Sequence, residues 1–233
     1  MVRQGLRACR AIIYMVKITA SSYKEQLLKT IRLAWVQACY PGFRCHHTAD
    51  VQINGQLDVR GVVNVGRHSR IYVERGARLI LGGGNMILDH VIIGANVCIE
   101  IGEGVSIQDH CILLGDVSIG QSTLLAPRVF ISSGTHQFRG SPEKFISSWT
   151  PIRIQDALMP AQGKRVSIGK DCWIGTNSTL LPGSSMLDGC IVGANSVVTG
   201  QSIDCYCIYA GCPARLIGHR WIPSSRQIRE SRD

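Results

Sequence analysis

A six-residue period over residues 168–199 is the feature that most restricts the fold of this chain. An aliphatic residue or Met opens each block of six, and a small residue stands four places later. The openers are Ile168, Ile174, Leu180, Met186, Val192 and Val198. The period fits neither an amphipathic helix, which repeats about every 3.6 residues, nor a lone half-buried strand, which alternates. It is the signature of a parallel β-helix built from hexapeptides.

Each block is expected to form one short strand and one corner, so that three blocks complete one coil of a triangular prism. The opening side chain then points into the prism and stacks on its equivalents in the coils above and below. The small residue occupies the crowded corner, where Gly and Asn also tolerate a positive φ. Because no block can bury its apolar face alone, stability must come from stacked neighbours.

The same register is present upstream and then stops. It runs through Ile93 and Ile99, slips by two residues, and continues through Ile101, Ile107, Leu113, Ile119, Leu125 and Ile131. The repeat is absent from Ser132 until Val166. Loops longer than about 12–15 residues inside a compact domain are usually functional or disordered. We therefore predict a loop at about 132–165 that projects from the prism.

The chain of 233 residues is long enough for one sizeable domain with appendages. We divide it into an N-terminal arm (1–40), a β-helix domain (41–218) and a polar basic tail (219–233). The arm is expected to be helical, because apolar residues recur at helical spacing at Leu27, Leu28, Ile31 and Trp35. Two interpretations stay open for residues 1–38: a peripheral contact with an anionic membrane, or a cap on the end of the prism.

Positive charge is concentrated at the two ends of the chain. Residues 1–36 hold seven basic residues and one acidic residue, a net charge of +6, and residues 214–233 hold five and two, a net charge of +3. Residues 37–213 carry 13 of each sign. Basic ends suit nucleotide phosphates or an acidic membrane surface. We expect no nucleic-acid partner, because the chain has no recognisable binding module and no aromatic interleaving.

The ten cysteines do not predict a disulfide framework or a metal site. Cys111, Cys172 and Cys190 fall at the small position of a block and are interpreted as apolar filler. The remaining Cys and His lack the spacing of a closed four-ligand zinc site, so we expect no metal. No secretory signal and no membrane span are recognised, and the cytoplasm is the expected location.

Four segments resemble the hexapeptide-repeat acyltransferases, in particular the maltose/galactoside O-acetyltransferases and related acetyltransferases of surface-polysaccharide clusters. They are IGQSTLLAPRVFISSGTH (Ile119–His136), CWIG (Cys172–Gly175), IVGANSVVT (Ile191–Thr199) and GCPARLI (Gly211–Ile217). The resemblance covers roughly residues 55–218 and excludes the arm. It implies a left-handed parallel β-helix, all-β apart from the arm, and a homotrimer with cofactor sites between subunits.

The resemblance also implies an activity. The catalytic His of the family maps onto His136, which directly follows Ser-Ser-Gly-Thr where the repeat stops. Such a His removes the proton of an acceptor hydroxyl or amine as that group attacks the thioester of acetyl-CoA, and an imidazole suits this task because its pKa lies near neutrality. The alternative for His136 is an ordinary loop residue.

Positions that match the coenzyme A contacts of the family are Trp173, Thr176, Ala194 and Thr199, with Arg215 near the nucleotide phosphates. Trp173 could equally be a corner packing residue, and Arg215 a solvated surface residue. Two departures concern the phosphates and the acceptor. Gly200 stands where the sugar enzymes often carry Lys, and Ser106 aligns with their acceptor-binding Asn. Gln108 and Asp109 lie nearby, and Asp109 could orient His136 or bind the acceptor.

Three other functions occur on the same repeat or fold. A γ-class carbonic anhydrase requires a His pair with a spacing that this chain lacks. A non-catalytic hexapeptide scaffold has no need for the loop His or the G-x-P-A-R segment. A serine or amino-sugar N-acetyltransferase of the same fold remains the main alternative. We predict an acetyl-CoA-dependent O-acetyltransferase that acts on a sugar hydroxyl, with a glycan of the cell surface as the expected acceptor.

Overall fold

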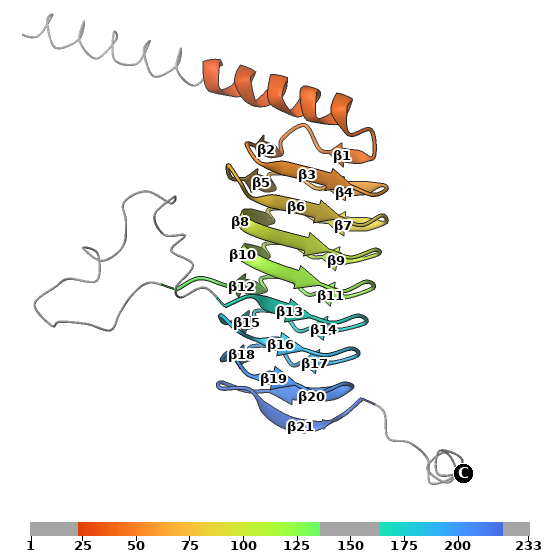
Figure 1. Ribbon diagram of the computed structural model, residues 1–233, viewed down its shortest axis with the longest axis vertical. Helices are drawn as coiled ribbons and strands as arrows, with labels where there is room; N and C mark the ends of the chain where they lie inside the picture. Colours follow the sequence, from red (N-terminus) through yellow and green to blue (C-terminus); the bar gives the residue numbers. More distant parts are fainter. Residues whose placement is uncertain (1–22, 136–163, 221–233) are drawn as a thin grey trace, which may run out of the picture.

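The computed structural model describes residues 23–135 and 164–220. In these residues the chain winds as a parallel β-helix, and one helix (23–39) lies across its N-terminal end (Figure 1). Successive coils stack below the helix towards the C-terminal end. The predicted all-β fold with a short helical segment before it is confirmed.

The strands form three faces, which we call A, B and C in the order in which each coil visits them. Face A consists of β1 (Phe43–Cys45), β4 (Val63–Val65), β7 (Asn85–Ile87), β9 (Ser106–Ile107), β11 (Leu124–Leu125), β14 (Trp173–Ile174), β17 (Ile191–Val192) and β20 (Cys207–Ala210). A last strand, β21 (Arg215–His219), pairs antiparallel with β20 and ends this face.

Faces B and C share two long strands, β8 (Ile92–Ile101) and β10 (Ile112–Ile119), which bend from one face into the other. The rest of face B is β2 (Asp50–Ile53), β5 (Arg70–Val73), β12 (Phe130–Ser132), β15 (Thr179–Leu180) and β18 (Val197–Val198). The rest of face C is β3 (Gln56–Val59), β6 (Arg78–Leu81), β13 (Val166–Ile168), β16 (Ser185–Met186) and β19 (Ser202–Ile203).

The interior is the aliphatic ladder that the period predicts. Each opening residue named above is at most 4 % exposed, on both sides of the two-residue slip. The small corner residues are buried as well, and their hydroxyl groups are satisfied by backbone: Ser178 Oγ donates to Gly193 O at 2.8 Å, and Ser184 Oγ donates to Leu181 O at 2.7 Å. Buried hydroxyls without such partners would be costly.

The buried cysteines have the filler role that their positions predict. Cys111, Cys172 and Cys190 lie in the corners, and the Sγ atom of Cys111 donates to Ala126 O at 3.1 Å. Burial raises the pKa of the Cys111 thiol to about 11, so this group stays protonated near neutral pH. The cysteines of the described residues are all free thiols.

The helix caps the prism, but with a different face from the one that its sequence suggests. Leu33 and Val36 are 6 % and 2 % exposed and belong to the same core as the ladder. The apolar residues whose spacing predicts the helix are instead 47–60 % exposed: Leu27, Leu28, Ile31 and Trp35. The helix therefore has two apolar faces. None of the described helices is long and apolar enough to cross a membrane.

Candidate active site

Face A carries a column of outward-pointing side chains in exact register from coil to coil. Ser106 pairs with Leu124, Leu124 with Trp173, and Trp173 with Ile191. Trp173 is 49 % exposed although its backbone belongs to the rigid ladder. The structure thus places a predicted acceptor residue and a predicted cofactor residue in one column, two coils apart.

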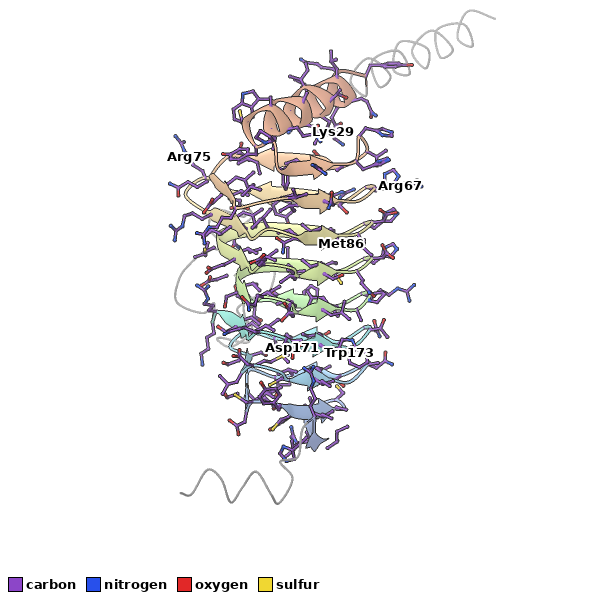
Figure 2. All side chains as sticks on the ribbon, turned by 90° about the vertical axis from the view of Figure 1, so that its right-hand side faces the viewer. Lys29, Arg67, Arg75, Met86, Asp171 and Trp173 are labelled. Atoms are coloured by element: carbon purple, nitrogen blue, oxygen red, sulfur yellow. The ribbon has the colours of Figure 1, made fainter. Side chains whose placement is uncertain are left out.

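Figure 2 looks onto this face and shows Trp173 on it, with Met86 further up. Met86 is in the same column, because it pairs with Ser106, and it is 51 % exposed. Arg67 and Arg75 mark opposite edges of the molecule in this view. Arg67 lies at the corner between faces A and B, called the A–B corner below, and Arg75 lies at the B–C corner.

The A–B corner holds a second column, formed by Asp109, Pro127, Thr176 and Ala194. Backbone hydrogen bonds set its register: Arg128 N donates to Asp109 O, Asn177 N to Pro127 O, and Asn195 N to Thr176 O, each at 2.9 Å. Thr176 Oγ1 also donates to Pro127 O at 2.8 Å. Two predicted cofactor residues and one predicted acceptor residue therefore form a continuous edge beside the Trp173 column.

The coils are tightly packed where this edge meets face A. A Cβ atom on Gly175 would lie 2.5 Å from the backbone N of Ala194, and one on Gly193 would lie 2.9 Å from Cβ of Ala210. Successive coils therefore approach too closely here for a side chain, which explains both glycines. We call the surface that runs from Trp173 to Thr176 and Ala194 the strip. Gln108 starts the same strip one residue before Asp109, and it is half-buried.

Asp109 has a structural task at this corner. Its Oδ1 accepts the backbone N–H of Asp89 at 2.9 Å, and Oδ1 of Asp89 in turn accepts the N–H of Arg67 at 2.6 Å. The carboxylates thus tie one turn to the next. The described root of the 136–163 segment lies at the B–C corner instead, and Asp109 as the group that orients His136 stays a prediction.

Three histidines stack beside the carboxylates on the outside of the A–B corner. The ring centroids of His68 and His90 are 5.1 Å apart, and those of His90 and His110 are 4.8 Å apart with nearly parallel planes. All three have a positive φ of 55–61°, a conformation in which His, Asn and Asp are enriched. The backbone conformation therefore explains why His occurs at these three positions. No group of three or more His, Cys, Asp or Glu side chains in the described ranges could hold a metal ion.

The loop is rooted at the B–C corner, after β12. Ser133 is buried, its Oγ accepts the N–H of Asp116 at 2.7 Å, and its N donates to Leu114 O at 3.1 Å. Lys164 N donates to Ser133 O at 3.1 Å, which joins the two ends of the loop. His136 itself lies outside the described residues, so its catalytic role stays a prediction.

Two polar residues above the loop root were not identified from the sequence. Asn96 and Asp116 each have a buried Oδ1 atom without a hydrogen-bond partner among the described residues. Asp116 Oδ1 is 3.3 Å from Arg165 Nη1, an ion pair that lacks hydrogen-bond geometry, and Arg165 also lies 3.7 Å from Glu100. The signal available in the sequence is that both interrupt apolar strands, at the corner where the repeat later stops.

The last two predicted residues lie apart from the Trp173 column. Thr199 directly follows β18, at the same B–C corner as the loop root and in lower coils. Arg215 begins β21, opposite Ala210, where its Nη1 donates to Ala214 O at 3.0 Å and its side chain is exposed. Arg215 is therefore at the C-terminal end of face A. One chain gathers Ser106, Gln108, Asp109, Trp173, Thr176 and Ala194 along one face and edge, and keeps the loop root on another corner.

Comparison with known proteins gives a family for the repeat. Residues 165–200 match the model described as bacterial transferase hexapeptide (six repeats). The chain is 38 % identical over 108 residues to the putative lipopolysaccharide biosynthesis O-acetyl transferase WbbJ of Escherichia coli (strain K12). This alignment covers 46 % of the chain and 53 % of WbbJ. The chain is 36 % identical to the probable macrolide acetyltransferase of Lysinibacillus sphaericus, over 50 % of the chain and 67 % of that protein.

Among solved structures, the polySia specific acetyltransferase NeuO aligns over 78 % of this chain and 92 % of its own, with 22 % sequence identity and a TM-score of 0.45. The chain spans about half the length of WbbJ (53 %). The matched repeat coincides with the lower coils of the observed β-helix, and the relatives named above are acetyltransferases by name. The chain is therefore a hexapeptide-repeat protein related to the acetyltransferases that carry this repeat.

Proposed function

We propose that this protein transfers the acetyl group of acetyl-CoA to a hydroxyl group of a sugar, as a step in surface-polysaccharide biosynthesis. The observation that carries the proposal is the continuous strip of face A and the A–B corner, which collects three predicted cofactor residues and three predicted acceptor residues. The name of the WbbJ relative supports the hydroxyl acceptor and the polysaccharide context.

Acetyl-CoA would lie along the coils. Trp173 offers an exposed ring for packing against the pantetheine arm or adenine, and Ala194 is exposed on the adjoining A–B corner. Arg215 would meet a nucleotide phosphate by charge-assisted bonding. Thr199, at the other corner, would contact a cofactor bound by a neighbouring copy.

His136 would act as the general base. It takes the proton of the acceptor hydroxyl while that oxygen forms a bond to the thioester carbonyl carbon; the C–S bond then breaks and the coenzyme A thiolate takes up a proton. The oxyanion formed on the way needs a backbone N–H donor. Asp116 is the residue that we assign to support this step, because its backbone N–H donates to Ser133 at the loop root. Its buried Oδ1 is ion-paired with Arg165 but makes no hydrogen bond among the described residues. It could accept the second N–H of the imidazole.

The site would be complete between copies. The strip at the A–B corner and the loop root at the B–C corner lie at different corners of the same chain. In a homotrimer, the loop of one copy would meet the strip of its neighbour, and Ser106, Gln108 and Asp109 would face the acceptor. The basic segment 1–38 would hold the enzyme beside a glycan precursor at the cytoplasmic face of a membrane.

The proposal is tested by incubating the purified chain with acetyl-CoA and a panel of sugars, sugar nucleotides, serine and a macrolide. Release of the coenzyme A thiol is measured with a colorimetric thiol reagent, and the products are identified by mass spectrometry. We expect release that depends on a sugar and a product heavier by one acetyl group. Base-labile products identify O-acetyl esters, whereas stable products identify amides. Release with serine alone, or with no acceptor in the panel, would contradict the proposal.

A further inference from the structure

The outer face of the helix 23–39 is an apolar surface with a fixed orientation. Leu33 and Val36 are buried against the first coil. Gln37 Nε2 donates to Cys45 O at 3.1 Å, and Lys29 Nζ lies 3.6 Å from Asp50 Oδ2. Lys29 is between the helix and the prism in Figure 2. These contacts prevent the helix from rolling, so the opposite side chains remain outside.

The opposite side is a stripe formed by Leu27, Leu28, Ile31 and Trp35, which are 60 %, 47 %, 55 % and 59 % exposed. Tyr23, at 77 % exposure, lies one turn before it. Because the helix crosses the end of the prism (Figure 1), the stripe forms the end surface of the described molecule. An apolar stripe of this size on a water-exposed helix indicates a partner.

Charge identifies the kind of partner. Lys24 and Arg32 flank the stripe, with Glu25 as the single acidic residue of the helix. Residues 1–22 add Arg3, Arg7, Arg10 and Lys17 and contain no acidic residue. A second copy docked on the same face would bring two such basic segments together, which like-charge repulsion opposes. An anionic lipid surface offers both the apolar boundary and the opposite charge, and Trp and Tyr favour this boundary.

We infer that the outer face of helix 23–39 docks on an anionic membrane surface, with Leu27, Leu28, Ile31 and Trp35 entering the boundary between headgroups and acyl chains. The proposed function includes a membrane contact, and this inference names the residues that make it. The inference does not depend on acetyl transfer. The prism axis would then point away from the membrane, with the coils of the candidate site below the helix.

The test is flotation of the full chain with vesicles of phosphatidylcholine containing about one third phosphatidylglycerol, beside vesicles of phosphatidylcholine alone. The variant Ile31→Ser/Trp35→Ser is compared with Val62→Ser/Leu187→Ser, which removes apolar side chains of 40 % and 45 % exposure elsewhere on the prism. We expect binding to anionic vesicles that salt weakens, and a loss of about tenfold or more in the helix variant, with the control unchanged. Acetyl transfer to a dissolved sugar should be equal in both variants.

Other occupants of the stripe give different results. Equal vesicle binding by both variants overturns the inference. The inference is also overturned if the wild type does not bind vesicles and the helix variant has a lower native mass than the wild type. The stripe then binds a second copy. If the full chain does not bind vesicles but a chain without residues 1–22 does, the stripe is covered by residues 1–22 in the full chain. This result also overturns the inference. Unchanged circular dichroism of the helix variant excludes misfolding. If acetyl transfer is not detected, vesicle binding, native mass and circular dichroism still test this inference.

Discussion

Replacing His136 with Ala is expected to lower kcat by about 10²- to 10⁴-fold, which is the usual contribution of a positioned general base. Acetyl-CoA binding should change little, because the residues assigned to the cofactor lie on the strip of face A and the A–B corner. The measurement is the rate of thiol release at saturating acetyl-CoA and sugar, with the Kd of coenzyme A determined separately by calorimetry.

His90→Asn is the matched control for His136→Ala. It removes an imidazole from the A–B corner, where His90 has a φ of 59°, and Asn tolerates this left-handed conformation. We expect its kcat to stay within about twofold of the wild type, since a corner side chain of this kind makes no general-base contribution. A His136→Ala enzyme as active as the control would show that another group, or solvent, removes the proton.

Leu113→Ala is expected to lower the free energy of unfolding by about 2–5 kcal/mol, which combines lost apolar burial with a cavity that the coils cannot close. Leu113 is fully buried on β10, which pairs with β8 and β12 and so lies in the middle of the stack. Backbone ladders on both sides hold the neighbouring coils at a fixed spacing and limit collapse. Urea unfolding, followed by circular dichroism at one protein concentration, measures the effect.

Leu187→Ala removes the same atoms from a side chain that is 45 % exposed at the corner between faces C and A. Its free energy of unfolding should stay within about 0.5 kcal/mol of the wild type, as for most surface substitutions. Similar urea midpoints for the two variants would contradict the ladder as the main source of stability.

The ladder could be predicted from the sequence because its cause is local. A period of six places Ile107, Leu113 and Ile131 inside the prism whatever the rest of the chain does, and all three are fully buried. Register also places Ser106 and Trp173 in one column once the coils are counted. The parallel β-helix and the alignment of these two residues therefore follow from spacing, whereas their roles rest on the family resemblance.

Other features depend on contacts that spacing does not encode. The helical spacing of Leu27, Ile31 and Trp35 predicts a helix, but the face that docks is selected by the fit of Leu33 and Val36 against the first coil. The buried Oδ1 atoms of Asn96 and Asp116, which make no hydrogen bond among the described residues, lie where strands bend at the B–C corner. Such positions appear as breaks in an apolar run, and their burial becomes visible in three dimensions.

Complementation is the most direct test of a site that is shared between copies. His136→Ala disables the loop, and Ala194→Trp fills the strip at the exposed A–B corner; each variant alone should be nearly inactive. When differently tagged copies of the two are coexpressed and mixed trimers are isolated, about a third of the sites should combine an intact loop with an intact neighbouring strip. A site shared between copies predicts recovery of about that fraction of wild-type activity. Isolated mixed oligomers that remain as inactive as the single variants would contradict it.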